Sequence, residues 1–149
     1  MTAFGFQVVA DAARPHDQAD WWALALGWEV EPSDEAFIRK MIAEGYAQES
    51  DTMLHNGTLV WAGGAAIRPP GGAAAAAGPG YSRLLFQLVP EGKTVKNRMH
   101  LDIRTGPEDQ EEVVRRLAAA GATELHRGAQ GPHHWVTMAD PEGNEFCVA

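Results

Sequence analysis

The feature that most constrains the fold of this chain is an internal repeat. Two alternating, strand-like segments, FGFQVVAD at residues 4–11 and RMHLDIRT at 98–105, each run into a helical segment that begins just after a proline and ends at a glycine. The matching positions are Pro15 and Pro107, Gln7 and His100, and Gly27 and Gly121, which lie 92, 93 and 94 residues apart. Three offsets that agree within two residues predict a duplicated unit.

Both helical segments carry an apolar stripe that would pack on a sheet. The helix over 16–26 is expected to end at Gly27 and the helix over 108–120 at Gly121, because glycine readily adopts the left-handed conformation of a C-terminal cap. The expected core residues are Trp21, Trp22, Leu24, Ala25 and Leu26 in the first helix and Val113, Val114, Leu117 and Ala118 in the second.

The remaining segments predict an α+β fold with a β-α-β-β-β plan in each half. Further strands are expected at 28–31, 57–67 and 81–89, and at 122–126, 133–140 and 145–149, with an extra helix over 33–45 capped by Ser33. The Gly, Ala and Pro content of residues 68–80 predicts an irregular loop, either a plain surface connection or a flap. We expect residues 1–92 and 93–149 to form two modules of a single domain, with one curved sheet around a cleft.

Charge and cysteine content limit the partners and the compartment. With 12 basic and 20 acidic side chains, the net charge of −8 would repel a phosphate backbone, so nucleic acid is not an expected partner. The first fifteen residues have neither a basic segment nor a long apolar run, which predicts no signal peptide and no membrane partner. The single cysteine, Cys147, is expected to be a buried, small apolar residue in a cytoplasmic protein.

Strand alternation indicates which side chains of residues 98–105 face away from the helix. Successive residues of a strand point to opposite faces of the sheet. Met99, Leu101 and Ile103 suit the helix side. The opposite side is then expected to carry His100, Asp102 and Arg104.

The same parity, combined with the repeat, gives one polar candidate on each of four strands. Gln7 is the positional twin of His100 by the repeat offset, and Gln87 and Glu145 are polar residues on the last strand of each half. We expect these four side chains to face the cleft.

The repeat also carries a resemblance. The duplicated plan, with FQLVPEGKTVKNRMHLDI (86–103) and WVTMADPEGNEFCV (135–148), resembles the glyoxalase, bleomycin-resistance and dihydroxybiphenyl-dioxygenase proteins of the vicinal oxygen chelate superfamily. It covers nearly the whole chain and looks most like the small bacterial glyoxalase-like domain proteins. The resemblance implies a small-molecule ligand and a homodimer. It does not choose a reaction, because members of the superfamily isomerise, cleave rings, open epoxides or only bind drugs.

Metal-using members of that superfamily take ligands from the first and last strands of each module. The resemblance therefore implies one divalent ion (nickel, zinc, manganese or iron) held by Gln7, Gln87, His100 and Glu145. The ion would stabilise an enolate or oxyanion, with His100 and Glu145 as the catalytic pair and Glu145 as the proton shuttle. The chain departs from the pattern, because two neutral amides leave a +2 ion undercompensated and Gln87 stands where a carboxylate is expected. A site without metal is an equal alternative.

Two functional hypotheses follow from different classes. The first is a metal-dependent lyase or isomerase of the glyoxalase type that acts on a small oxygenated substrate. The second is a metal-free protein that sequesters an aromatic or antibiotic-like ligand. Trp61 and Trp135 would form flat apolar walls for a ligand, or belong to the core. Asp102 and Arg104 would bind substrate, or pair with each other.

Overall fold

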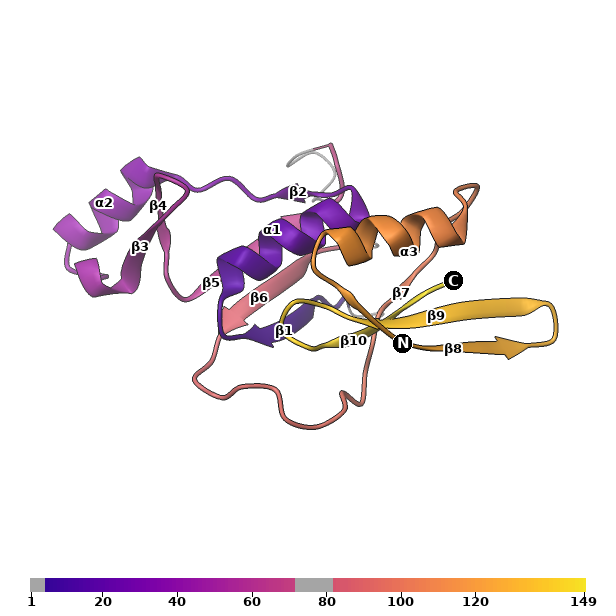
Figure 1. Cartoon of the computed structure of the whole chain (residues 1–149). Helices are drawn as coiled ribbons and strands as arrows, with labels where there is room; N and C mark the ends of the chain where they lie inside the picture. Colours follow the sequence, from indigo (N-terminus) through magenta and orange to yellow (C-terminus); the bar gives the residue numbers. More distant parts are fainter. Residues whose placement is uncertain (1–4, 72–81) are drawn as a thin grey trace, which may run out of the picture. The chain divides into compact units, whose positions relative to one another are not determined.

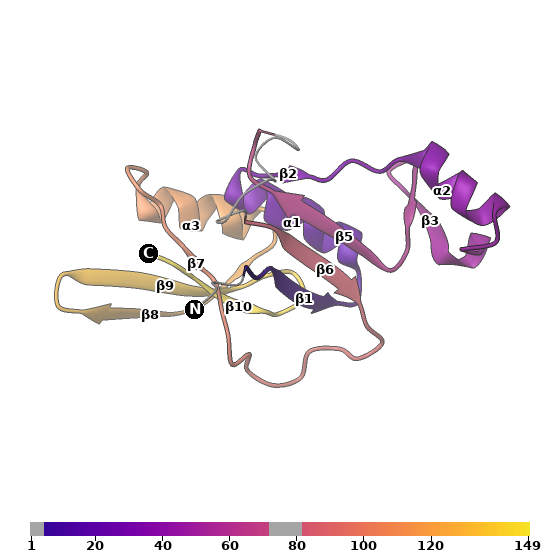
Figure 2. The same cartoon turned by 180° about the vertical axis from the view of Figure 1, so that it is seen from behind.

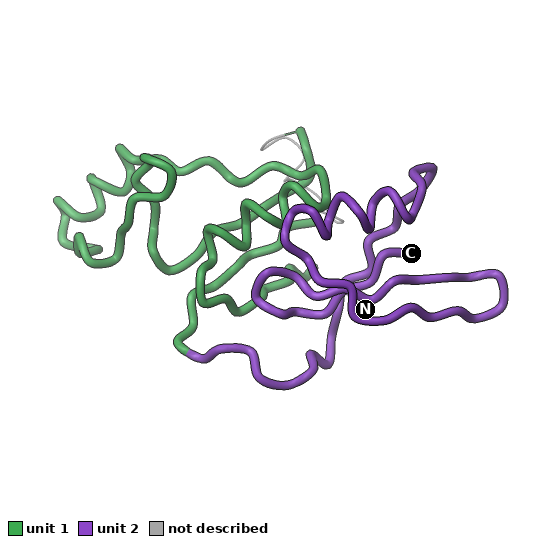
Figure 3. The backbone as a smooth tube through the Cα atoms, viewed as in Figure 1, with its two compact units in different colours: residues 1–90 green, residues 91–149 purple. Residues whose placement is uncertain are grey.

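The computed structural model describes residues 5–71 and 82–149. Most of the predicted loop at 68–80 lies outside these residues. The chain divides into two compact units, residues 1–90 and 91–149 (Figure 3). We call them unit 1 and unit 2.

Unit 1 is built on a four-stranded sheet with one helix packed against it (Figure 1). Strand β1 runs parallel to β6, and β6 and β2 are both antiparallel to β5, which gives the order β1-β6-β5-β2. Seen from behind, β5 and β6 lie in front of α1 (Figure 2). The elements are β1 (Val8–Ala12), α1 (Pro15–Leu26), β2 (Glu29–Val30), β5 (Gly64–Arg68) and β6 (Leu84–Leu88).

Unit 2 repeats this arrangement. Its sheet has the order β7-β10-β9-β8, in which β7 is parallel to β10 and the other neighbours are antiparallel. The elements are β7 (Asp102–Ile103), α3 (Gln110–Ala119), β8 (Thr123–Gln130), β9 (His133–Ala139) and β10 (Glu145–Val148). The two orders are equivalent strand for strand, which confirms the predicted α+β fold with a duplicated β-α-β-β-β plan.

Unit 1 differs from unit 2 by an insertion between β2 and β5. It contains α2 (Glu35–Ala43), the short 3-10 helix η1 (Glu49–Asp51), and the hairpin of β3 (Thr52–His55) and β4 (Thr58–Trp61). The prediction of one strand over 57–67 was wrong, because the chain turns at residues 62–63 and β4 pairs with β3 instead of joining the main sheet. The helix cap was also wrong. Asp34, not Ser33, accepts the Phe37 N–H, while Ser33 donates to the Leu59 carbonyl.

The predicted helix stripes are largely buried. Trp21, Trp22 and Ala25 of α1 are in the core, and Gly27 ends the helix in the left-handed conformation, with φ 66°. Leu24 was placed wrongly, because at 60% exposure it lies outside the buried stripe of α1. In α3 the predicted stripe holds for Val113, Val114 and Leu117, while Ala118 is exposed.

Each sheet has one face against its helix and one face away from it. Buried residues of the helix-side faces include Leu84, Phe86 and Ile67 in unit 1 and Val136, Met138, Phe146 and Val148 in unit 2. We call the opposite side of each sheet its far face. Alternation and the strand pairing place Val9 and Leu85 on the far face of unit 1, and Asp102, Thr137 and Cys147 on the far face of unit 2.

Strand β7 is shorter than the predicted strand over 98–105. Met99 was expected on the helix side, but it is 85% exposed. The pairing of Cys147 with Asp102 sets Glu145, the first residue of β10, beside His100. Residues before His100 therefore have no β10 residue to pair with, which explains the exposed Met99.

Candidate functional site

The far face of unit 1 joins its polar side chains to each other. Arg83 makes a two-pronged ion pair with Glu31, at 2.7 and 2.8 Å, and also donates to the Gln7 Oε1 at 3.1 Å. Arg68 and Glu29 form a further pair at 2.9 Å. The side-chain oxygen of Gln7, a predicted metal ligand, therefore already accepts a hydrogen bond from Arg83.

The strand register separates the two glutamines of unit 1. Val8 pairs with Leu84, so Gln7 lies beside Arg83, whereas Gln87 pairs with Asp11. Four residues along parallel strands correspond to about 13 Å. Gln7 and Gln87 share a face, as parity predicts, but the register does not bring them together.

In unit 2, Glu145 lies beside His100 on the strand register but is held by other groups. Its Oε1 accepts a hydrogen bond from the Lys93 Nζ at 3.0 Å, and its Oε2 accepts one from the Asn97 N–H at 3.1 Å. Its side chain is only 14% exposed. Burial by itself would raise the pKa of Glu145, but the Asn97 N–H and the Lys93 ammonium outweigh it and hold the pKa at about 2, below the ordinary 4.5. Glu145 is therefore an ionised, already paired carboxylate at neutral pH.

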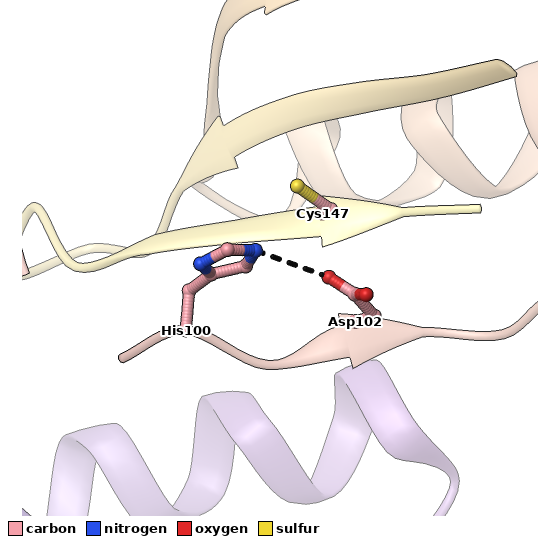
Figure 4. Close-up of side chains that lie close together, drawn as sticks. All are labelled: His100, Asp102 and Cys147. Carbon is pink, nitrogen blue, oxygen red and sulfur yellow. Dashed lines mark ion pairs between the residues drawn. The ribbon is translucent and has the colours of Figure 1, made fainter. Parts of the chain in front are cut away.

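A second group of donors lies beside it. His100, Asp102 and Cys147 each offer one ligand atom, and these atoms all lie within 4.8 Å of one another (Figure 4). The His100 Nε2 is 3.3 Å from the Asp102 Oδ1. His100 and Asp102 are exposed, whereas Cys147 is buried and its Sγ lies 3.5 Å from the Thr137 hydroxyl. We call His100, Asp102 and Cys147 the donor cluster.

The two tryptophans predicted as ligand walls occupy different settings. Trp61 ends the β3–β4 hairpin of the insertion, where its backbone carbonyl lies 2.8 Å from the His16 Nε2. Trp135 is half-buried on the far face of unit 2, opposite Gly128 of β8. A Cβ placed on Gly128 would overlap the Trp135 indole, so the ring lies directly against the glycine backbone.

Asp102 and Arg104 were expected either to bind substrate or to pair with each other. Asp102 forms its described ion pair with His100 rather than with Arg104. Arg104 is exposed just after the end of β7. Its predicted role in substrate binding stays a prediction.

The sequence patterns did not indicate the contacts that Cys147 and Lys93 make. Cys147 was expected to be a buried apolar residue, and it is buried, but it is also part of the donor cluster. Strand alternation could have indicated this, because Cys147 follows Glu145 by two residues on one strand and so shares its face. Lys93 had no comparable local signal, since its partner Glu145 is 52 residues away.

Comparisons with known proteins identify the family of the chain. The glyoxalase-like domain family matches residues 7–149. The chain belongs to the glyoxalase-like domain family. No curated protein matches it. Within the described residues, none of the helices is both long and apolar enough to cross a membrane.

Solved structures with the same fold have little sequence in common with this glyoxalase-like protein. The fosfomycin resistance protein FosX from Mesorhizobium loti is 8% identical, with a TM-score of 0.61 over 99% of this chain and 91% of that one. The bleomycin-binding protein from Streptomyces verticillus, solved with copper(II)-bleomycin, is 14% identical, with a TM-score of 0.53 over 100% and 97%. A glyoxalase/bleomycin resistance protein/dioxygenase family enzyme from Burkholderia phytofirmans is 14% identical, with a TM-score of 0.54 over 95% and 94%. These likenesses confirm the vicinal oxygen chelate fold.

The metal that the superfamily implies can be compared with the residues predicted to hold it. In unit 1, Gln7 is engaged by Arg83 and stands four register positions from Gln87. In unit 2, both oxygens of Glu145 accept hydrogen bonds from Lys93 and Asn97. These four residues therefore fit the implied ion poorly, and their role as one ligand set stays a prediction.

Proposed function

We propose that this glyoxalase-like protein binds and sequesters a small, flat, ring-bearing molecule on the far face of unit 2. The observation that carries this proposal is the seat of Trp135. Its indole is backed by the bare backbone of Gly128 while the residue remains partly exposed, so one side of the ring is held and part of the residue stays accessible. A supported indole gives a ligand contact area at little cost in side-chain entropy.

The groups around Trp135 suit recognition of a polar aromatic ligand. His126 and Gln130 of β8 share the far face with Trp135, because they pair with Thr137 and His133 on the same parity. Both are exposed. They add hydrogen-bonding groups to an apolar ring, which is the usual composition of a site for a small organic molecule.

The state of Glu145 favours binding over proton-transfer catalysis. A general base works best when its pKa lies near the working pH, and a carboxylate with a pKa of about 2 is a weak base at neutral pH. The fold is shared with the bleomycin-binding protein of Streptomyces verticillus, which supports a binding role without assigning bleomycin to this chain.

The proposal is tested by screening the untagged, chelator-treated chain against planar aromatic fragments with ligand-observed NMR and calorimetry. Trp135→Ala is expected to weaken a bound fragment roughly 10-fold, a change of about 1.4 kcal/mol. His134→Ala is the matched control within unit 2, since His134 precedes Trp135 on β9 and so points to the opposite face of the sheet, and it should leave affinity unchanged. A fragment that binds Trp135→Ala as tightly as the wild-type chain would count against the site.

The second candidate is a metal-dependent lyase or isomerase for a small oxygenated substrate. It is favoured by the donor cluster, since a bound divalent ion there would supply Lewis acidity. The matching test is substrate turnover with and without added ions, in the wild-type chain and in Glu145→Gln. Turnover that needs the ion and falls in Glu145→Gln would favour this candidate over simple sequestration. The homodimer and the cytoplasmic location remain predictions, and light scattering of the purified chain tests the first.

A further inference from the structure

The donor cluster belongs entirely to unit 2 and is set by two neighbouring strands. Cys147 of β10 pairs with Asp102 of β7, so both side chains project from the same face. The Cys147 N–H donates to the Leu101 carbonyl at 2.9 Å, which keeps the segment just before β7 alongside β10. His100, two residues before Asp102, has the same parity. Figure 4 shows His100 and Asp102 on the segment next to the strand that carries Cys147.

The spacing of the three donors suits one small metal ion. Ligand bonds of 2.0–2.3 Å in a tetrahedral zinc site put neighbouring donor atoms about 3.4–3.7 Å apart. The His100 Nε2 and Asp102 Oδ1 are 3.3 Å apart, and all three donor atoms lie within 4.8 Å. Cys147 is buried, so the exposed side chains of His100 and Asp102 are the ones that can rotate to shorten the longest separation.

The chemical types select a class of ion. A thiolate and an imidazole suit zinc and its neighbours in the first transition row, whereas calcium and magnesium prefer oxygen ligands only. A Cys147 thiolate and an Asp102 carboxylate carry two negative charges, which match a +2 ion. The set of Gln7, Gln87, His100 and Glu145 brings one negative charge, already compensated by Lys93.

The surroundings of the cluster supply a supporting hydrogen bond and an approach for the ion. The Thr137 hydroxyl, 3.5 Å from the Cys147 Sγ, can donate to a thiolate and fix its direction. His100 and Asp102 are 41% and 57% exposed at their side chains, so an ion can reach them from solvent.

We propose that His100, Asp102 and Cys147 form a zinc-class metal site in unit 2, with the fourth tetrahedral position open to an oxygen or nitrogen of a ligand. Three protein ligands with one open position are the arrangement of zinc sites that bind substrates. This site uses Cys147 and Asp102 where the superfamily resemblance implies Glu145 and two residues of unit 1. It does not depend on ligand binding at Trp135.

The test uses the full chain, purified without a histidine tag and freed of metal with a chelator. Co²⁺ is added first, because thiolate-bound cobalt gives a near-ultraviolet charge-transfer band, and Zn²⁺ is then titrated by calorimetry. One ion per chain and a cobalt band that Zn²⁺ abolishes are expected. Cys147→Ser should remove the band, and Asp102→Asn and His100→Ala should each weaken Zn²⁺ by at least roughly 10–100-fold. A wild-type chain that binds neither ion stoichiometrically would overturn the site.

Two controls separate this site from its alternatives. His133→Ala removes an exposed histidine from the same far face and should leave Zn²⁺ affinity unchanged. Glu145→Gln should also change the Zn²⁺ affinity by no more than a few-fold. If Glu145→Gln lost Zn²⁺ binding while Cys147→Ser bound it normally, the ion would instead be assigned to the ligand set that the superfamily resemblance implies. Because Cys147 is buried, circular dichroism must show that Cys147→Ser is folded; if it is not, the exposed Asp102→Asn decides the result. Fragment binding to the metal-free chain reports separately on Trp135.

Discussion

Units 1 and 2 share one topology and differ in what occupies the same positions of the far face. The repeat offset and the two parallel registers align Gln7, Val9, Leu85 and Arg83 of unit 1 with His100, Asp102, Cys147 and Glu145 of unit 2. At these positions unit 1 has two apolar side chains and an amide tied to an arginine. Unit 2 has three potential metal ligands and a carboxylate paired with a lysine.

The difference shows that a duplicated fold determines where side chains stand on the sheet but not which side chains stand there. In both units the helix-side face is apolar and buried, because packing against α1 or α3 demands it. The far face is free of that demand, so polar groups can vary there. Unit 1 uses them in ion pairs among themselves, through Arg83–Glu31 and Arg68–Glu29, and unit 2 keeps a group of donors together.

The largest expected effects come from the buried core of each unit. Phe146→Ala in unit 2 and Phe86→Ala in unit 1 each remove a fully buried ring, and each should cost about 3–5 kcal/mol of unfolding free energy. If the units unfold together, both variants shift a single urea transition in the same way. Two separated transitions in either variant would show that the units are independently stable, and Val95→Ala, at an exposed side chain, serves as the near-neutral control.

The next effect probes the packing of Trp135 against Gly128 in unit 2. Gly128→Ala should destabilise the chain by about 2–3 kcal/mol, because the new methyl overlaps the indole of Trp135 unless the ring moves. Thermal unfolding measures the loss, and Gly63→Ala, where a Cβ would meet nothing within 4 Å, is the control. Equal shifts for the two variants would mean that Trp135 does not rest on Gly128.

The Lys93–Glu145 pair should make unit 2 sensitive to acid. A carboxyl whose folded-state pKa is about 2 stabilises the fold above its ordinary value of 4.5, and that contribution is lost as the pH falls from about 4.5 to 2. Lys93→Met leaves the half-buried carboxylate without its cation and should cost about 2 kcal/mol at pH 7.

Urea unfolding from pH 7 to pH 2 measures this prediction. The difference between the wild-type chain and Lys93→Met should shrink as Glu145 is protonated. Lys96→Met is the control, because the Lys96 Nζ donates only to the neighbouring Asn97 carbonyl among its described contacts. A difference that stays constant across the whole pH range would contradict the assigned role of Lys93.

The smallest effect comes from transferring the donor cluster to unit 1. The triple variant Gln7→His, Val9→Asp, Leu85→Cys places the same donors at the aligned positions. Its added site should bind Zn²⁺ roughly 10-fold more weakly than the site in unit 2, because Ala66 stands where unit 2 has Thr137 and offers no hydroxyl to the thiolate. Calorimetry in a Cys147→Ser background isolates the new site, and no binding there would show that topology alone does not position the donors.

Local patterns in the sequence were enough for the repeat, the helices and the parity of the far face. The Gly27 cap, the buried Trp21 and the β-α-β-β-β order all follow from short-range rules. The β3–β4 hairpin also had a local signal that was overlooked, because Asn56-Gly57, both with positive φ, is a two-residue turn between alternating segments.

Register and long-range pairing could not be read in the same way. Parity placed Gln87 on the correct face, but the counterpart of Glu145 is Arg83, four residues earlier, because β1 and β6 pair from Val8 and Leu84. The neutralisation of Glu145 depends on Lys93, and the donor cluster depends on Cys147 standing beside Asp102. Each of these contacts joins residues more than forty positions apart, so only the folded chain reveals them.

The seat of Trp135 on Gly128 also provides an experimental probe. Of the five tryptophans in the chain, four lie in unit 1, at positions 21, 22, 28 and 61, and Trp135 alone reports on unit 2. With 5-fluorotryptophan incorporated, the fluorine resonance that disappears in Trp135→Phe identifies this ring. Its shift on adding an ion or an aromatic fragment would then follow events on one sheet of a duplicated protein, with four internal references.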